Sequence, residues 1–112
     1  MTYQRGDVVL IPFPFTDLTA HKRRPVLLLS DPDAYGDFLA VAITSQPGHT
    51  DAIALDSSDF QHGVLPKPSW LRSSRLYSLH QVSVVGVFGN LTPAALARLH
   101  TAVCRQLGCN ES

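Results

Sequence analysis

The chain contains a basic junction that leads directly into an apolar run, RRPVLLLS at residues 23–30. The aliphatic residues of this run favour a strand, and we predict a mostly buried strand from Pro25 to Ser30. A second run, FLAVAIT at residues 38–44, has the same character and predicts a strand that is buried on both faces. These two segments form the centre of the predicted fold.

Shorter strands are predicted on either side of this centre. VVLI at residues 8–11 predicts a first strand, and PFPF at residues 12–15 ends it because proline cannot donate to a ladder. The polar and basic residues 16–24 then predict a hairpin-like loop. DAIALD at residues 51–56 alternates polar and apolar residues, which suits a half-exposed strand.

The second half of the chain continues the pattern of short strands. Residues 57–63 predict a closing turn, and WLRSSRLY at residues 70–77 predicts a strand with one functional face. Residues 79–82 predict a single turn, and residues 83–89 predict the last strand.

A helix is predicted at the carboxyl end. Thr92 suits an N-cap with Pro93 at the first helical position, and leucine and valine recur at helical spacing up to Gly108. Five or six strands without helices between them, followed by one helix, predict a mainly β fold. We expect a small curled or barrel-like antiparallel sheet that the C-terminal α-helix caps.

Length and composition restrict the possible classes of protein. The 112 residues, of which 45% are hydrophobic, predict one domain over residues 1–109 with a short tail at 110–112. Nine basic residues balance nine acidic ones, so a site for a polyanion must be a local patch. The two cysteines are expected to be reduced thiols. No stretch approaches the roughly 18 apolar residues of a membrane span, and we expect a soluble, cytoplasmic protein.

Familiar catalytic motifs are missing from the sequence. It has no glycine-rich phosphate loop, no H-E-x-x-H pair, no G-x-S-x-G elbow and no double C-x-x-C, and its five histidines are scattered. We therefore expect no metal and no cofactor. What remains is a set of basic residues, and guanidinium groups fit phosphate and stabilise charge in a phosphorane-like transition state. The 2′-hydroxyl of RNA is its own nucleophile, so a small site that aligns it could support cleavage.

Several segments follow one another in a recognisable order: GDVVLI at 6–11, KRRPVLLLS at 22–30, AITSQ at 42–46, WLRSSRL at 70–76 and VGVFGNLT at 85–92. In this order and spacing they resemble the successive strands of PemK/MazF toxins of type II toxin-antitoxin systems. The resemblance extends from about Arg5 to Leu107.

This resemblance implies an SH3-like barrel and a homodimer that a cognate antitoxin neutralises. It also implies an endoribonuclease that cleaves single-stranded mRNA at short sequences without metal, and such cleavage leaves 2′,3′-cyclic phosphate ends. The catalytic residues of the family map to Arg24 and Thr44, and Arg72 adds positive charge. Neighbouring polar and basic residues are candidate RNA contacts, namely His21, Lys22, Arg23, Ser45, Gln46, Ser74 and Arg75.

One position departs from the family pattern. Some members carry an Arg-x-Asp motif on the later strand, and here Arg72 fits whereas Ser74 stands in place of the aspartate, so the general base is not identified. His21 has suitable chemistry, although a loop histidine is more often simply solvated. A non-catalytic SH3-like binding module and a gyrase-poisoning toxin of the same fold are the alternative functions.

Overall fold

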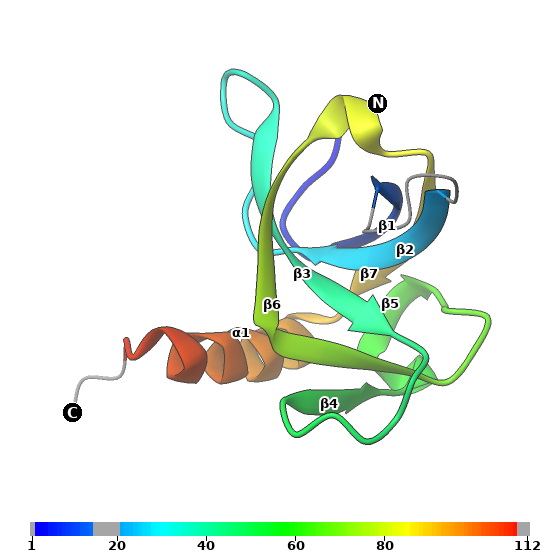
Figure 1. The fold of residues 1–112 in the computed structure, drawn as a ribbon, viewed down its shortest axis with the longest axis vertical. Helices are drawn as coiled ribbons and strands as arrows, with labels where there is room; N and C mark the ends of the chain where they lie inside the picture. Colours follow the sequence, from blue (N-terminus) through cyan, green and yellow to red (C-terminus); the bar gives the residue numbers. More distant parts are fainter. Residues whose placement is uncertain (1, 15–20, 110–112) are drawn as a thin grey trace.

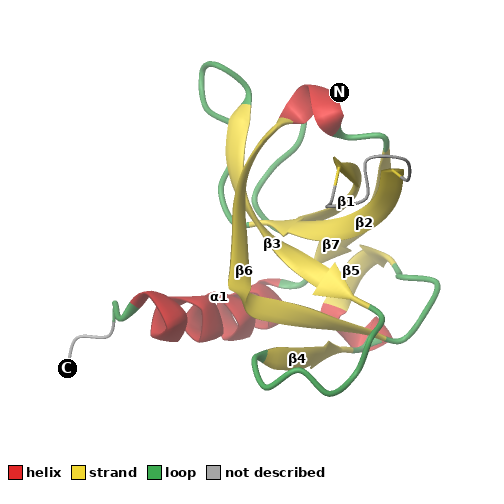
Figure 2. Cartoon of the chain, in the orientation of Figure 1, coloured by secondary structure: helices red, strands yellow, loops and turns green. Residues whose placement is uncertain are grey.

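The computed structural model describes residues 2–14 and 21–109 and shows a curled antiparallel sheet with one C-terminal helix (Figures 1 and 2). Seven strands form the sheet in the order β4-β6-β3-β2-β1-β7-β5. The predicted mainly β fold with a C-terminal helix is confirmed. The strands are β1 (Asp7–Pro14), β2 (His21–Leu28), β3 (Asp37–Thr44), β4 (Ala52–Leu55), β5 (Phe60–Gly63), β6 (Ser69–His80) and β7 (Gly86–Leu91), with 3-10 helices η1 (Ser57–Asp59) and η2 (Gln81–Ser83) and the helix α1 (Pro93–Leu107).

Strand β1 continues through the two prolines that were predicted to end it. The carbonyl oxygen of Leu10 accepts a hydrogen bond from the backbone of Val85, so Leu10 faces β7. The backbone nitrogens of Pro12 and Pro14 point to the same side of the strand, because the direction of the backbone N and C=O groups alternates from one residue to the next. The register between β1 and β7 ends at Leu10, and among the described strands β2 alone continues beside β1. The prolines therefore lie on an open edge, where a missing N–H costs no ladder hydrogen bond.

Other boundaries also differ from the predictions. Strand β2 begins at His21 rather than Pro25, because it pairs with β1 as far as Pro14. The predicted turn over residues 57–63 instead holds η1 and β5, and the predicted turn over 79–82 is divided between β6 and η2. Residues 16–20 of the predicted loop and the tail at 110–112 lie outside the described residues.

The hydrophobic core occupies both faces of the sheet. Val8, Leu27 and Val41 pack with the buried face of α1 on one side, whereas Val9 and Val26 belong to a second cluster on the other side. Neighbouring residues of one strand thus enter opposite clusters, as side-chain alternation requires. The helix contributes Ala95, Leu96, Leu99 and Val103 to the first cluster.

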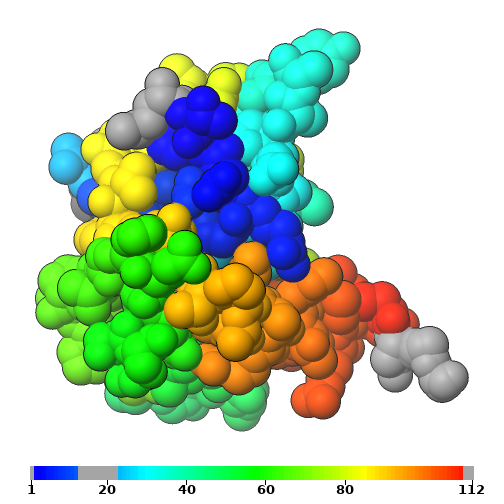
Figure 3. Space-filling model, turned by 180° about the vertical axis from the view of Figure 1, so that it is seen from behind, coloured from blue at the N-terminus to red at the C-terminus, as the bar shows by residue number. Residues whose placement is uncertain are grey.

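Helix α1 has the boundaries that the sequence predicts. The Thr92 hydroxyl oxygen accepts a hydrogen bond from the backbone of Ala95 at 3.1 Å, and Gly108 ends the helix in the left-handed conformation. Two side-chain contacts fasten the helix to its neighbours. Arg98 donates to both carboxylate oxygens of Asp59 in η1, and an Arg5 nitrogen lies 3.1 Å from Nδ1 of His100. Figure 3 accordingly shows the helix surface between the N-terminal segment and the segment around residue 60.

We predict that Asp59→Ala lowers the free energy of unfolding by about 1–3 kcal/mol, because it leaves the Asp56 N–H and Arg98 without their acceptor. The Arg98 hydrogen bonds hold the pKa of Asp59 below its ordinary value. The contribution is therefore complete above about pH 4 and is lost as the pH falls below that value. Urea unfolding followed by Trp70 fluorescence at pH 7 and pH 3 measures both effects. A double-mutant cycle with Arg98→Ala isolates the pair, and a coupling of zero would contradict this role.

The pairing of β5 with β7 generates a second prediction, because the two backbones meet at Gly63 and Gly89. A Cβ atom on Gly63 would lie 1.9 Å from the carbonyl oxygen of Phe88, and the φ angle of Gly63 is +77°. We expect Gly63→Ala to lower the free energy of unfolding by roughly 1–3 kcal/mol. Gly86→Ala is the matched control, since a Cβ there meets Leu10 only at an ordinary 3.7 Å. Equal unfolding midpoints for the two variants would refute the prediction.

Candidate active site

A sharp bend in β6 forms one wall of the candidate site. In the pairing of β3 with β6, Val41 lies opposite Leu76 whereas Ile43 lies opposite Leu71. Two steps along β3 thus correspond to five along β6, and the extra residues of β6 are accommodated in an irregular segment. Irregularities of this kind bend a strand and redirect its side chains. The bent segment contains Arg72 and Arg75, both of which line the pocket described below.

The bend is held together by Asp51, which lies between β3 and β4. One carboxylate oxygen of Asp51 accepts a hydrogen bond from Nε of Arg72 at 3.1 Å. The other accepts from the backbone N–H of Ser74 at 3.3 Å and from its hydroxyl at 2.5 Å. The carbonyl oxygen of Asp51 accepts from the backbone and hydroxyl of Ser73 at 3.2 and 3.0 Å. Asp51 therefore binds three consecutive residues of β6.

These contacts also determine the charge state of Asp51. Burial raises its pKa, but the hydrogen bonds from Ser74 and Arg72 outweigh burial and lower the pKa to about 2. The carboxylate is therefore ionised at all ordinary pH values. Ser74 was noted as a departure from the Arg-x-Asp pattern, and the structure shows that Asp51, from another part of the chain, places a carboxylate within hydrogen-bond distance of Ser74 and Arg72.

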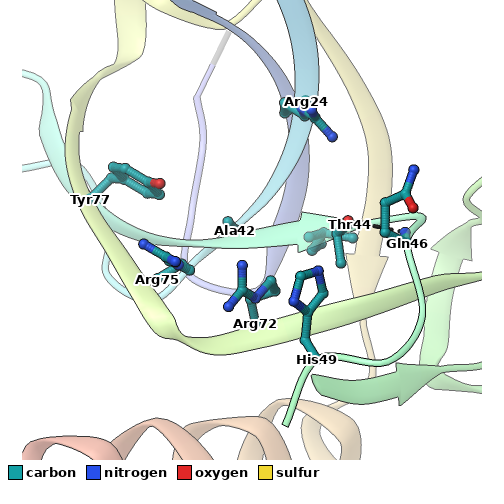
Figure 4. A pocket seen from close by; sticks show the side chains of 9 residues that line it. Arg24, Ala42, Thr44, Gln46, His49, Arg72, Arg75 and Tyr77 are labelled. Atoms are coloured by element: carbon teal, nitrogen blue, oxygen red, sulfur yellow. Dashed lines mark hydrogen bonds between the residues drawn. The ribbon is translucent and has the colours of Figure 1, made fainter. Parts of the chain in front are cut away.

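A pocket with a volume of about 290 Å³ lies between β2, β3 and the bend of β6 (Figure 4). Arg24 enters it from β2, Thr44 from the end of β3, and Arg72 and Arg75 from β6. None of the described residues that line it is Asp or Glu. The pocket therefore concentrates positive charge in a chain whose net charge is zero. Its complete lining is Arg24, Ala42, Ile43, Thr44, Gln46, His49, Arg72, Arg75 and Tyr77.

The hydroxyl group of Thr44 has a defined orientation. Thr44 is 8% exposed, and its Oγ1 accepts a hydrogen bond from the backbone N–H of Gln46 at 3.1 Å. Because this bond uses a lone pair, the hydroxyl hydrogen can still be donated to a ligand in the pocket. The turn after β3 thus presents a hydroxyl donor next to the arginines.

A second cavity of about 430 Å³ continues from the first and shares Arg24, Ile43 and Gln46 with it. Its lining adds further basic and polar residues together with the apolar surface of Phe88. The two cavities form one groove, which we call the basic groove. The lining residues of the second cavity are Arg23, Arg24, Pro25, Ile43, Ser45, Gln46, Leu65, Pro66, Lys67, Ser69 and Phe88.

The structure brings together most of the residues that were chosen from the sequence. Arg24, Thr44, Arg72 and Arg75 line the first cavity, Arg23 and Ser45 line the second, and Gln46 lines both. Ser74 does not line either cavity and binds Asp51 instead. The side chains of His21 and Lys22 lie outside the described part of the molecule.

Several residues of the site, among them Tyr77 and Phe88, were not predicted as site residues from the sequence. His49 and Lys67 line the groove, and Asp51 supports it. His49 and Lys67 lie next to turn residues, where no local pattern distinguishes a site residue from a solvated one. Only the fold shows that these turns border the same groove.

The described residues provide no evident site for a metal ion. Within residues 2–14 and 21–109, no three His, Cys, Asp or Glu side chains gather into a group that could hold one. Among the same residues, no helix is long and apolar enough to cross a membrane.

Comparison with solved structures shows the same fold in known proteins. An endoribonuclease in complex with its cognate antitoxin from Mycobacterial species has a TM-score of 0.78 and 20% identity, covering 98% of this chain and 99% of that chain. MazE-MazF from Deinococcus radiodurans has a TM-score of 0.79 and 21% sequence identity, and the match covers 98% of this chain and 99% of that chain. Mycobacterium tuberculosis toxin MazF-mt6 has a TM-score of 0.70 and 16% sequence identity, and the match covers 94% of this chain and 99% of that chain.

Sequence comparison gives the family. No curated protein matches the chain in sequence. The profile of the family described as "PemK-like, MazF-like toxin of type II toxin-antitoxin system" matches residues 4–107, which is nearly the whole chain. The protein therefore belongs to the PemK/MazF-like toxins of type II toxin-antitoxin systems.

Proposed function

We propose that this toxin is an endoribonuclease that cleaves single-stranded RNA at short sequences and needs no metal ion. The observation that carries the proposal is the convergence of Arg24, Thr44 and Arg72, from three different strands, on one pocket. Family membership supports it, since similar structures include a protein named as an endoribonuclease. The alternatives, a non-catalytic binding module and a gyrase poison, do not require these three residues to meet.

The pocket suits attack by the 2′-hydroxyl on the adjacent phosphate. Arg24 and Arg72 lie where their guanidinium groups can bind the phosphate oxygens and stabilise the charge that develops on them. The hydroxyl of Thr44 donates a further hydrogen bond and positions the phosphate. The 2′-oxygen bonds to phosphorus as the bond to the 5′-oxygen breaks, so the products carry a 2′,3′-cyclic phosphate and a 5′-hydroxyl.

The remainder of the basic groove suits the flanking nucleotides. Arg23 and Lys67 provide charge for the backbone, and Ser45 and Gln46 provide hydrogen bonds. Phe88 offers an apolar surface in the same cavity. These residues are proposed RNA contacts, together with Arg75 and the basic residues His21 and Lys22.

Protein partners are also proposed. A cognate antitoxin is expected, as two of the similar structures are toxin-antitoxin complexes. A homodimer is expected as well. Three valines before and within β7 are unusually exposed for apolar residues, with Val82 at 80%, Val85 at 51% and Val87 at 48%, and they offer a surface that a second subunit could cover.

We predict that Arg24→Ala lowers the rate of RNA cleavage by about 10²–10³-fold, because it removes a donor to the developing charge. The purified protein is incubated with single-stranded RNA. Primer extension then maps the cleavage sites, and end-group analysis identifies the product ends. Cleavage is expected to persist in EDTA. Arg105→Ala, an exposed arginine in the last turn of α1, is the matched control. Full activity in Arg24→Ala, or dependence on a divalent cation, would reject the proposed mechanism. The gyrase alternative would be favoured if expression is toxic, the purified protein cleaves no RNA, and it inhibits supercoiling of DNA by gyrase.

We predict that Asp51→Asn slows cleavage by roughly 10–100-fold by loosening Arg72. The substitution is expected to have little further effect in an Arg72→Ala background. The asparagine keeps the backbone carbonyl that binds Ser73 and an oxygen acceptor for Ser74, so what it loses is the ion pair with Arg72. Since the pKa of Asp51 is about 2, any change in wild-type rate above about pH 4 does not come from this group. Asp33→Asn is the control, as Asp33 accepts backbone hydrogen bonds in the turn at the opposite end of β3. Additive losses in the double variant would show that Asp51 does not position Arg72.

A further inference from the structure

His49 is the one imidazole among the described residues that line the first cavity. It lies between β3 and β4, and Figure 4 shows its ring extending into the pocket between Arg72 and Thr44. The side chain is partly buried. We propose that His49 is the general base that takes the proton from the 2′-hydroxyl, an inference that rests on the proposed ribonuclease function.

The chemistry of the other lining residues leads to this assignment. A general base needs a lone pair that accepts a proton near neutral pH. The guanidinium groups of Arg24, Arg72 and Arg75 carry only hydrogen-bond donors and have no lone pair that could take a proton. The hydroxyl groups of Thr44 and Tyr77 are too weakly basic, and so is the amide of Gln46. Imidazole is the side chain that readily gains and loses a proton in this range.

The nearest carboxylate does not take this role. Both oxygens of Asp51 accept hydrogen bonds from β6, and its pKa of about 2 makes it a weak base. Asp51 instead fixes the segment that carries His49. Asp51 lies two residues after His49 and binds Ser73 and Ser74. The carbonyl oxygen of His49 accepts a hydrogen bond from the backbone N–H of Ala52 at 3.1 Å. The start of the same segment is held by the hydrogen bond from Gln46 to Thr44.

In the proposed step, a nitrogen of neutral His49 accepts the proton of the 2′-hydroxyl. The electron pair left on the 2′-oxygen forms the new bond to phosphorus. The bond from phosphorus to the 5′-oxygen breaks, and that oxygen takes a proton from water. The resulting hydroxide removes the proton from the imidazolium, so the side chain returns to its starting state.

The pH dependence of this step can be assigned because the charged groups around His49 are constant. Asp51 stays ionised above about pH 4, and the guanidinium groups of Arg24, Arg72 and Arg75 line the same cavity. The hydroxyl of Tyr77 is the other titratable group that lines the cavity. Since the base acts in its neutral form, the rate is expected to fall as the pH decreases from 8 to 5.

The test measures single-turnover cleavage by the full chain, using a short RNA centred on the cut site mapped for the wild type. His49→Asn is expected to slow cleavage about 10²–10³-fold and to flatten the pH profile between 5 and 8. Binding of the same RNA with a 2′-deoxy nucleotide at the cut site is expected to stay within a few-fold of wild type. His62→Asn is the matched control, because His62 is exposed on β5 and lines neither cavity. Added imidazole is expected to restore part of the activity of His49→Ala.

Substrate chemistry separates a base from an acid. With sulfur in place of the 5′-oxygen, the leaving group needs no proton, but removal of the 2′-proton is still required. The loss in His49→Asn is therefore expected to persist on this substrate, and its disappearance would overturn the assignment as base. Near-normal cleavage and an unchanged pH profile in His49→Asn, with Arg24→Ala inactive, would overturn this inference but leave the proposed function intact. No RNA cleavage by the wild type would overturn both.

Discussion

The contacts of Asp51 with three consecutive residues of β6 are the constraint on which the groove depends. A strand that has more residues than its partner must bulge, and the bulge needs acceptors for the N–H groups that leave the ladder. Asp51 provides them with its carbonyl oxygen and its carboxylate. The same carboxylate binds Nε of Arg72. One residue between β3 and β4 thus both shapes the bend and orients a guanidinium group in the pocket.

This arrangement explains how a chain without net charge can form a pocket of concentrated positive charge. Arg24, Arg72 and Arg75 line a single pocket, where like charges repel one another. Asp51 partly offsets this repulsion at Arg72, and its low pKa follows from the hydrogen bonds that it accepts from Ser74 and Arg72. No carboxylate lines the pocket in the described structure, so a bound phosphate would relieve the remaining repulsion. The clustered guanidinium groups therefore favour an anionic ligand.

Much of the fold could be predicted from local patterns. The helix was predicted with its caps, Thr92 and Gly108, because capping depends on residues close in sequence. The buried run over residues 38–44 matched β3 for a similar reason. The prediction failed where a distant strand decides the outcome. Pro12 is tolerated in β1 because the pairing of β1 with β7 stops at Leu10. Strand β5 can pair with β7 because Gly63 and Gly89 allow the two backbones to approach closely.

The candidate site was also predicted only in part from local sequence, and the rest of it depends on tertiary contacts. The sequence by itself determined the capped helix, the buried strands and, through the order of its segments, the resemblance to the toxin family. Arg24 and Thr44 were candidate site residues that this resemblance implied. Only the tertiary structure decided that Asp51 supplies the carboxylate for Arg72 and that His49 faces the same pocket. Both residues lie in the connection before β4, where the local sequence predicted a strand from residue 51 but no site residue. Their roles come from the antiparallel pairing of β6 with both β3 and β4, which brings together residues far apart along the chain.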